Sequence, residues 1–261
     1  MISDAERREA AGVLATAERD RAPIGPLTKQ WPELDVTDAY EIQLINARQR
    51  AADGGVVRGH KVGLTSRAMQ QMLGVDEPDY GHLFADMFVS EGSVLAAADF
   101  CQPRVEIEVA FVLRDPLQGP GVTVADVLRA TAFVLPAIEI IDSRVRDWQI
   151  TLPDTIADNA SSARVVLGGT ATPPDRADLR LLGCILRRNG EILETGASGA
   201  ALGNPATAVA WLANKLGQLG ITLDAGHVVM PGACTRAADV SAGDVIRGDF
   251  DELGSVSVAF A

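Results

Sequence analysis

Two carboxylates stand close together in a segment that otherwise has the pattern of a buried β-strand. Residues 104–113 read Arg-Val-Glu-Ile-Glu-Val-Ala-Phe-Val-Leu, with alternating apolar positions and several β-branched side chains. Side chains two residues apart in a strand point to the same face, so Glu106 and Glu108 project together and Ile107 projects from the other face. Two like charges on one face repel each other and lose hydration when buried. A chain with this strand must therefore expose that face to solvent or place a cation beside it.

A third acid lies in an even more apolar setting. Glu139 is part of residues 133–142, Phe-Val-Leu-Pro-Ala-Ile-Glu-Ile-Ile-Asp, where an unpaired carboxylate would be costly to bury. A hard divalent cation would remove that cost, since Mg²⁺, Mn²⁺ and Ca²⁺ all prefer carboxylate oxygen. We therefore favour a cation near the acids. The alternative is that Glu106 and Glu108 face solvent on an amphipathic strand.

Lys61 is the second unusual residue, because it lies within the predicted strand at residues 56–64. Lysine is rarely buried without a partner, and strand alternation directs Lys61 away from the face of His60 and Val62. If Lys61 faces the acids, it could pair with them, bind a substrate carboxylate or exchange protons. The alternative is an exposed surface lysine. Gly63 would allow another group to approach the backbone closely.

Two loops carry further candidates. In Glu-Pro-Asp-Tyr-Gly-His-Leu, residues 77–83, Asp79 is a candidate acid or base, although an Asp after a Pro is equally explained by turn formation. Residues 153–162, Pro-Asp-Thr-Ile-Ala-Asp-Asn-Ala-Ser-Ser, are rich in small donors and acceptors that could orient a substrate or a water. The alternative for this segment is a polar loop that satisfies its own hydrogen bonds.

The composition argues against several classes of function. The 261-residue chain has a formal net charge of −12 and no basic block, which argues against nucleic acid or an anionic membrane as a partner. No apolar run is long enough to span a bilayer, and the N-terminus lacks an apolar signal core, so we expect a cytoplasmic protein. The cysteines form no C-x-x-C and the histidines no H-x-x-x-H, and no glycine-rich phosphate loop occurs. Zinc hydrolase and nucleotide chemistry are therefore not indicated.

The order of elements predicts an α+β fold. The predicted elements are a helix from Ser3 to Arg21, a helix capped by Thr37 with Tyr40, Leu44 and Ala47 on one face, a strand at 56–64, a helix from Ser66 to Met72, a helix at 124–130, a strand at 163–167, an Asn189-Gly190 hairpin at 184–193, a helix at 205–216 and a strand at 255–260. Irregularly spaced strands with few intervening helices favour a mixed β-roll or distorted barrel over a doubly wound sheet. We divide the chain into an N-terminal helical unit, residues 1–55, and a metal-binding catalytic domain, residues 56–261.

Five motifs occur in an order that resembles one known family. They are G-H-K-V-G-L-T-S from residue 59, E-P-D-Y-G-H-L from 77, P-R-V-E-I-E-V-A-F-V-L from 103, P-A-I-E-I-I-D-S-R from 136 and D-T-I-A-D-N-A-S-S from 154. Together they resemble the hydratase/decarboxylase branch of the fumarylacetoacetate hydrolase superfamily over nearly the whole chain. The resemblance implies the β-roll of that superfamily's C-terminal domain.

The resemblance also implies a site and an activity. The implied metal ligands, for one Mg²⁺ or Mn²⁺, are Glu106, Glu108 and Glu139, and the implied catalytic residues are Lys61, Asp79 and Ser161. The implied reaction adds water to 2-hydroxypenta-2,4-dienoate or a close 2-hydroxydienoate, giving 4-hydroxy-2-oxopentanoate in meta-cleavage degradation of aromatic or steroid rings. The implied protein is a homo-oligomer that can also form a complex with another enzyme of its pathway.

Three alternatives remain open at this point. A decarboxylase of 2-oxo-3-hexenedioate would share the metal site, but the decarboxylases that resemble this chain carry an apolar residue where it has Asp79. An acylpyruvate C–C hydrolase would need a histidine base, for which His60 and His82 are present. A non-catalytic subunit of the pathway is disfavoured, because all three metal acids are retained.

Overall fold

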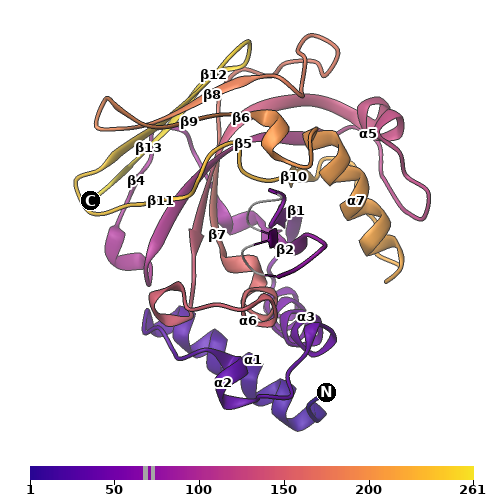
Figure 1. Cartoon of the computed structure of the whole chain (residues 1–261), viewed down its shortest axis with the longest axis vertical. Helices are drawn as coiled ribbons and strands as arrows, with labels where there is room; N and C mark the ends of the chain where they lie inside the picture. The colour runs from indigo at the N-terminus through magenta and orange to yellow at the C-terminus, as the bar shows by residue number, and fades with distance from the viewer. Residues whose placement is uncertain (67–69, 72–73) are drawn as a thin grey trace.

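The computed structural model describes residues 1–66, 70–71 and 74–261, which form two β-sheets and a group of N-terminal helices (Figure 1). The described helices are α1 (Asp4–Asp20), α2 (Leu27–Gln30), α3 (Val36–Ala52), α5 (Val124–Ala130), α6 (Leu152–Ala157) and α7 (Pro205–Gly217). The larger sheet has the order β2 (Asp79–Phe84), β1 (Val57–Gly63), β10 (Val228–Met230), β5 (Pro103–Leu113), β6 (Thr131–Asp142), β7 (Ser162–Leu167) and β3 (Phe88–Val89), with β11 (Ala238–Asp239) paired to β5. The smaller sheet has the order β4 (Val94–Leu95), β13 (Gly254–Phe260), β12 (Val245–Phe250), β8 (Gly183–Arg188) and β9 (Glu191–Ala197).

The larger sheet is a half-barrel, and strand alternation gives its two faces different roles. On the outer face, Ile107 and Ile140 belong to an apolar cluster that also contains Ile246 and Val258 of the smaller sheet. The inner face carries a separate apolar cluster that includes Ala110 and other small or aliphatic residues. Polar side chains next to this inner cluster are thus shielded from water by the barrel itself. The predicted α+β fold with a mixed β-roll is confirmed.

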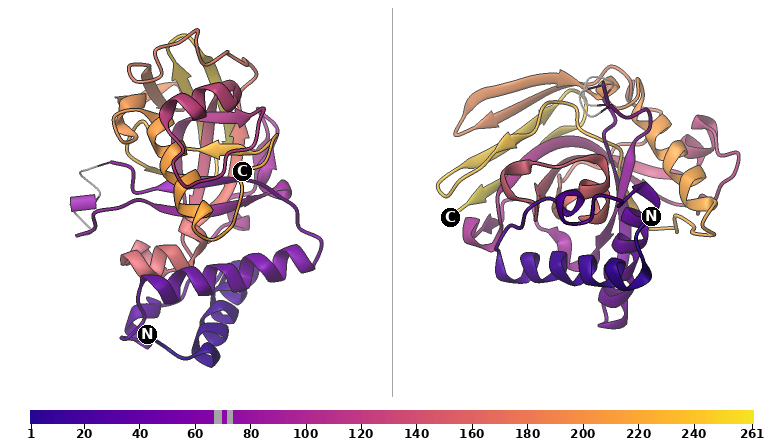
Figure 2. Two further views of the ribbon diagram at one scale, coloured as in Figure 1. Left: turned by 90° about the vertical axis from the view of Figure 1, so that its right-hand side faces the viewer. Right: turned by 60° about the horizontal axis from the view of Figure 1, so that its bottom comes forward.

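The N-terminal helices lie together at one end of the molecule, away from the smaller sheet (Figure 2). Ser3 caps α1 as predicted, because its side chain accepts from the Glu6 amide while the Glu6 carboxylate accepts from Ser3. The predicted start of α3 was wrong: Asp35, not Thr37, caps this helix by accepting from the Asp38 amide.

The predicted buried face of α3 was also shifted by one residue. Its buried residues are Asp38, Ala39, Ile42 and Gln43, whereas Tyr40, Leu44 and Ala47 are only partly buried. The reason is tertiary, since α3 packs between α1 and α6, and α6 belongs to a much later part of the chain. Because α6 joins the N-terminal helices in one apolar cluster, the division at residue 55 stays a prediction.

Most other local predictions are confirmed. Asn189 and Gly190 both have positive φ and connect β8 to β9 as a tight hairpin. The predicted helices at 124–130 and 205–216 correspond to α5 and α7, and the strands at 56–64, 163–167 and 255–260 to β1, β7 and β13. The helix predicted from Ser66 to Met72 lies largely outside the described residues.

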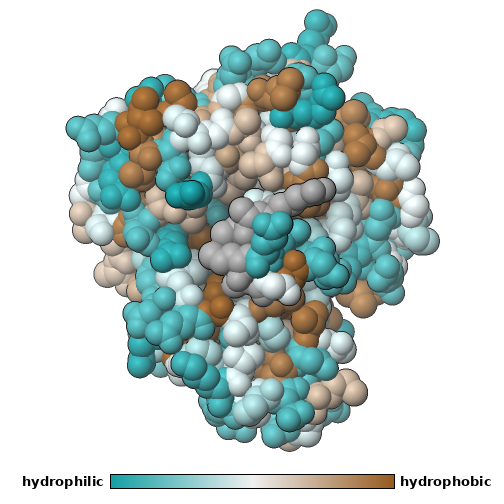
Figure 3. Space-filling view, viewed as in Figure 1, coloured by the Kyte–Doolittle hydropathy of each residue, from teal (hydrophilic) through white to brown (hydrophobic). Residues whose placement is uncertain are grey.

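The face shown in Figure 3 carries hydrophobic residues in small, separate groups among hydrophilic ones. Within the described ranges, no helix combines the length and apolarity that crossing a membrane requires. Cys184 and Cys234 are free and buried, and Cys101 is free and partly buried, so these thiols act as small packing residues.

Candidate active site

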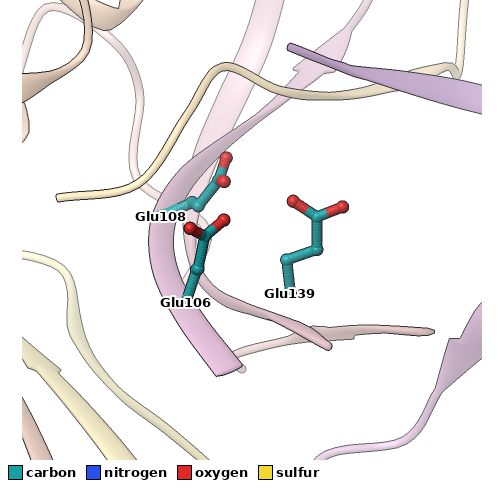
Figure 4. Close-up of side chains that lie close together, drawn as sticks. All are labelled: Glu106, Glu108 and Glu139. Carbon is teal, nitrogen blue, oxygen red and sulfur yellow. The ribbon is translucent and has the colours of Figure 1, made fainter. Parts of the chain in front are cut away.

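The three acids predicted to bind metal converge on the inner face of the half-barrel. In the antiparallel pairing of β5 with β6, Glu106 lies directly opposite Glu139, and Glu108 follows two residues along the same face. One carboxylate oxygen from each of the three side chains lies within 4.8 Å of the others. Figure 4 shows the three carboxylates turned toward a common space. Strand register thus brings together two segments that are about thirty residues apart in the chain.

The burial of these acids makes their charge costly. Glu108 and Glu139 are fully buried, and Glu106 is partly exposed. Burial raises the pKa of Glu108 well above its ordinary value, and the neighbouring carboxylates raise it further. Burial raises the pKa of Glu139 to about 7, although Lys61 opposes this shift. Three carboxylates held this close together are stable as anions only beside positive charge.

The donor set fits a hard divalent cation. The main-chain amide of Gly232 donates to Glu108 Oε2 at 2.8 Å. The other oxygen of Glu108 and both oxygens of Glu139 receive no hydrogen bond from the described residues. Buried oxygens without donors are what a cation such as Mg²⁺ or Mn²⁺ requires of its ligands. The alternative of a solvent-facing strand is wrong for Glu108 and does not apply to Glu139.

Lys61 is buried at the same place and is not a surface lysine. Its Nζ lies 3.5 Å from Glu139 Oε2 and donates to the main-chain carbonyl of Ala160 at 3.0 Å. Burial lowers the pKa of Lys61, but the surrounding carboxylates, led by Glu139 and Glu106, outweigh burial and raise it above its ordinary value. The side chain is therefore a fixed ammonium group that faces the acids.

Asp79 lies on the same inner face as Lys61, across the pairing of β2 with β1. Its register partner is Gly63, and a Cβ atom at that glycine would lie 2.1 Å from Asp79 Oδ1 and 3.5 Å from Lys61 Nζ. The position requires glycine because a Cβ atom would collide with the Asp79 carboxylate, whereas its distance to Lys61 Nζ would be an ordinary contact. Burial raises the pKa of Asp79, while Lys61 and hydrogen bonds that include one from Thr155 partly lower it. Thr155 is a contact that the sequence did not predict.

Ser161 belongs to a short 3-10 turn, Asn159–Ser161, that adjoins Lys61. Its hydroxyl makes a long hydrogen bond of 3.5 Å to the carboxylate of Asp158. The group that contacts Lys61 is the carbonyl of Ala160, which no side-chain pattern could have indicated. A direct role for Ser161 at the acids stays a prediction.

The three histidines of the chain gather on the outer face of the half-barrel. The ring centroid of His60 lies 5.0 Å from that of His82 and 6.1 Å from that of His227. Strand alternation places His60 opposite in direction to Lys61, as predicted. The acids therefore lack a neighbouring histidine base, which counts against C–C hydrolysis.

Comparison with known proteins identifies relatives of this chain. The family model for the fumarylacetoacetate (FAA) hydrolase C-terminal domain matches residues 51–260. The chain is 44% identical to the 2-keto-4-pentenoate hydratase of Paraburkholderia xenovorans, over 98% of this chain and 95% of that one. It is 43% identical to the 2-oxo-hept-4-ene-1,7-dioate hydratase of Escherichia coli, over 95% of each chain.

A solved structure shares the same fold. The 4-oxalocrotonate decarboxylase from Pseudomonas putida, complexed with magnesium and adipate, superposes with a TM-score of 0.97 and 37% identity, covering 100% of this chain and 99% of that one. The same decarboxylase has also been solved with calcium and acetate. With this fold, this site and these relatives, the chain belongs to the fumarylacetoacetate hydrolase family.

Proposed function

We propose that this protein is a metal-dependent hydro-lyase that adds water to 2-hydroxypenta-2,4-dienoate or a close 2-hydroxydienoate, giving 4-hydroxy-2-oxopentanoate in aromatic-ring degradation. The observation that carries the proposal is the convergence of three carboxylates with Lys61 and Asp79 on one buried face. The names of the relatives at 43–44% identity support the same reaction. Glu106, Glu108 and Glu139 would hold one Mg²⁺ or Mn²⁺, which when bound supplies positive charge at the C2 oxygen of a chelating 2-oxo acid.

The residues of the chain supply the proton transfers. The enol proton leaves the C2 oxygen and a proton is added at C5, which gives a 2-oxo-3-enoate. Water then adds its hydroxyl at C4 and a proton at C3. Lys61 is a buried ammonium donor beside the acids, and Asp79 is a buried carboxyl group of raised pKa on the same face. Ser161 would position substrate or water.

A decarboxylase is the second candidate, because the decarboxylase structure matches the whole chain at 37% identity. Hydration and decarboxylation can both pass through an enolate, so the three metal-binding glutamates do not distinguish between the two reactions. Asp79 favours hydration, since water addition needs an extra group to move protons. The discriminating assay incubates the Mg²⁺-loaded protein separately with 2-hydroxypenta-2,4-dienoate and with 2-oxo-3-hexenedioate. We expect loss of the diene absorbance with formation of 4-hydroxy-2-oxopentanoate. Faster CO₂ release from the hexenedioate would overturn the proposal.

Asp79→Asn separates the water step from enolisation. The substitution removes a titratable group while preserving the shape of the side chain. We expect hydration to fall by roughly 10²-fold or more, while solvent deuterium exchange at C3 of a saturated 2-oxo acid is largely retained. Equal loss of both rates would leave hydration standing but assign Asp79 to the shared enolisation step.

We also propose that the protein is a homo-oligomer. The smaller sheet exposes Val94 and Val245, which flank Ala259 on neighbouring strands, and Ile192 is exposed on the adjacent hairpin. Exposed apolar side chains that lie side by side on neighbouring strands can mark a protein–protein interface. Light scattering on the purified protein would test this proposal, and a monomer at micromolar concentration would contradict it.

A further inference from the structure

The turn that contacts Lys61 has an unfavourable backbone conformation. Asn159, Ala160 and Ser161 have φ values of 53°, 49° and 55°, so three consecutive non-glycine residues occupy the left-handed region. Each of these conformations is disfavoured for an L-residue and persists only where the surroundings hold it in place. Two sets of contacts, one on each side, hold this turn in place.

On one side, the turn is held by a buried ion pair. Arg144 Nε lies 2.5 Å from Asp158 Oδ1, and the Arg144 main-chain amide donates to the other carboxylate oxygen at 3.0 Å. The remaining guanidinium donors reach the carbonyls of Asp158, Asp142 and Ser162. One side chain thus joins the end of β6, the residue before the turn and the start of β7. Both partners are almost completely buried.

On the other side, the turn is held by β2. The Asn159 side-chain amide accepts from the His82 amide at 2.8 Å and donates to the His82 carbonyl at 3.0 Å, as a strand neighbour would. A Cβ atom at Gly81 would lie 2.4 Å from the Asn159 carbonyl oxygen, so the close approach requires glycine. Between these two supports, the Ala160 carbonyl points at Lys61 Nζ.

We propose that the Arg144–Asp158 ion pair is a positioning device for Lys61: it holds the 159–161 turn so that the Ala160 carbonyl fixes the ammonium group at a set distance from the acids. A lysine side chain is flexible, and without this carbonyl the opposite charge of Glu139 would draw it out of place. Among the described residues, no hydrogen bond joins Arg144 or Asp158 to the three acids, and the Ser161 hydroxyl reaches Asp158 only through a long hydrogen bond of 3.5 Å. Loss of the ion pair should therefore impair proton transfer without removing the metal site.

This inference rests on the proposed function only for its kinetic readout. In Asp158→Asn, we expect kcat for hydration to fall roughly 10- to 100-fold, as for other supporting residues, while KM and the Kd for Mn²⁺ stay within about twofold. A crystal structure of the variant should show a lengthened contact between Lys61 Nζ and the Ala160 carbonyl. Arg144→Lys, which keeps the charge but lacks the planar fork, should retain more activity and serves if Asp158→Asn does not fold.

The matched control is Asp38→Asn in the N-terminal helices. Asp38 is fully buried, and its carboxylate accepts from the Arg7 guanidinium and from the main-chain amides of Ile2 and Asp35. It thus resembles Asp158, but it lies far from the acids in the chain and in the fold (Figure 1). Asp38→Asn should lower Tm as much as Asp158→Asn and leave kcat unchanged. A wild-type kcat in folded Asp158→Asn, or an equal loss of kcat in Asp38→Asn, would overturn the inference. If the unmodified protein hydrates no dienoate, the proposed function fails, and the crystallographic distance still decides the role of the ion pair.

Discussion

Two buried clusters of charge in this protein are built on opposite principles. Around Arg144 and Asp158, one cation faces one carboxylate, and their donors and acceptors are taken up by hydrogen bonds to each other and to the backbone. Around Glu139, three carboxylates share a single ammonium group, Lys61, and several of their oxygens receive no donor from the described residues. The first cluster is complete as it stands, whereas the second is short of positive charge.

The difference separates a structural site from a reactive one. A buried pair whose partners satisfy each other stays ionised and fixes the backbone, because removing either partner leaves an unpaired buried charge. A cluster with excess negative charge raises its own pKa values and can bind a cation, and such strongly perturbed groups are typical of functional sites. The same half-barrel therefore contains the rigid Arg144–Asp158 ion pair and the cluster of acids around Glu139. The 159–161 turn connects the ion pair to this cluster.

Glu108→Gln should have the largest effect, because it reduces the excess negative charge that distinguishes the cluster of acids from the Arg144–Asp158 pair. It removes a metal ligand, so activity should fall by roughly 10³-fold or more as several kcal/mol of transition-state charge stabilisation are lost. Because the buried Glu108 must take up a proton when the metal-free chain folds near neutral pH and Gln need not, the metal-free variant should have a Tm roughly 2 to 4 °C above that of the metal-free parent. Activity assays and thermal scans after chelation test both expectations. Full activity in a rigorously metal-free preparation of the parent protein would show that the acids serve another purpose.

Lys61→Ala should reduce turnover by roughly 10²- to 10⁴-fold, the range for loss of one acid–base group. The substitution should lower the Tm of the Mn²⁺-loaded protein much less than that of the metal-free protein. The reason is that the bound metal supplies the positive charge that the acids otherwise receive from the ammonium group. Steady-state kinetics and thermal scans of the metal-loaded variant provide the comparison. Near-normal kinetics would mean that Lys61 only balances charge.

The smallest expected effect is a pH dependence of stability. Glu139, with its pKa raised to about 7, and Glu108 hold protons in the folded metal-free protein that the unfolded chain releases at lower pH. Their contribution to stability is therefore present at low pH and is lost as the pH rises through 7. Metal binding requires the deprotonated acids, so the rise in Tm caused by Mn²⁺ should grow by roughly 3 to 6 °C per pH unit between about pH 6 and 7. A metal-induced rise that is equal at both pH values would argue against proton competition in this cluster.

The sequence alone determined the features that depend on local periodicity. Alternation in a strand places Glu106 and Glu108 on one face and Lys61 opposite His60, whatever the rest of the fold does. The capping box at Ser3 and the positive-φ turn at Asn189 are likewise local, because a few neighbouring residues satisfy their backbone groups. The five ordered motifs predicted the family and the three metal-binding glutamates. That prediction came from similarity to known sequences and not from any knowledge of where the side chains lie.

Only the tertiary structure decided which of these faces meet. The register of β5 against β6 sets Glu106 opposite Glu139, and the return of the chain at residues 159–161 brings the Ala160 carbonyl to Lys61. The displaced buried face of α3 has the same origin, since α6 packs against it from a distant part of the sequence. Contacts made by main-chain carbonyls cannot be read from residue types, because every residue has the same backbone carbonyl. The packing of distant segments determines which of these carbonyls reach a charged side chain.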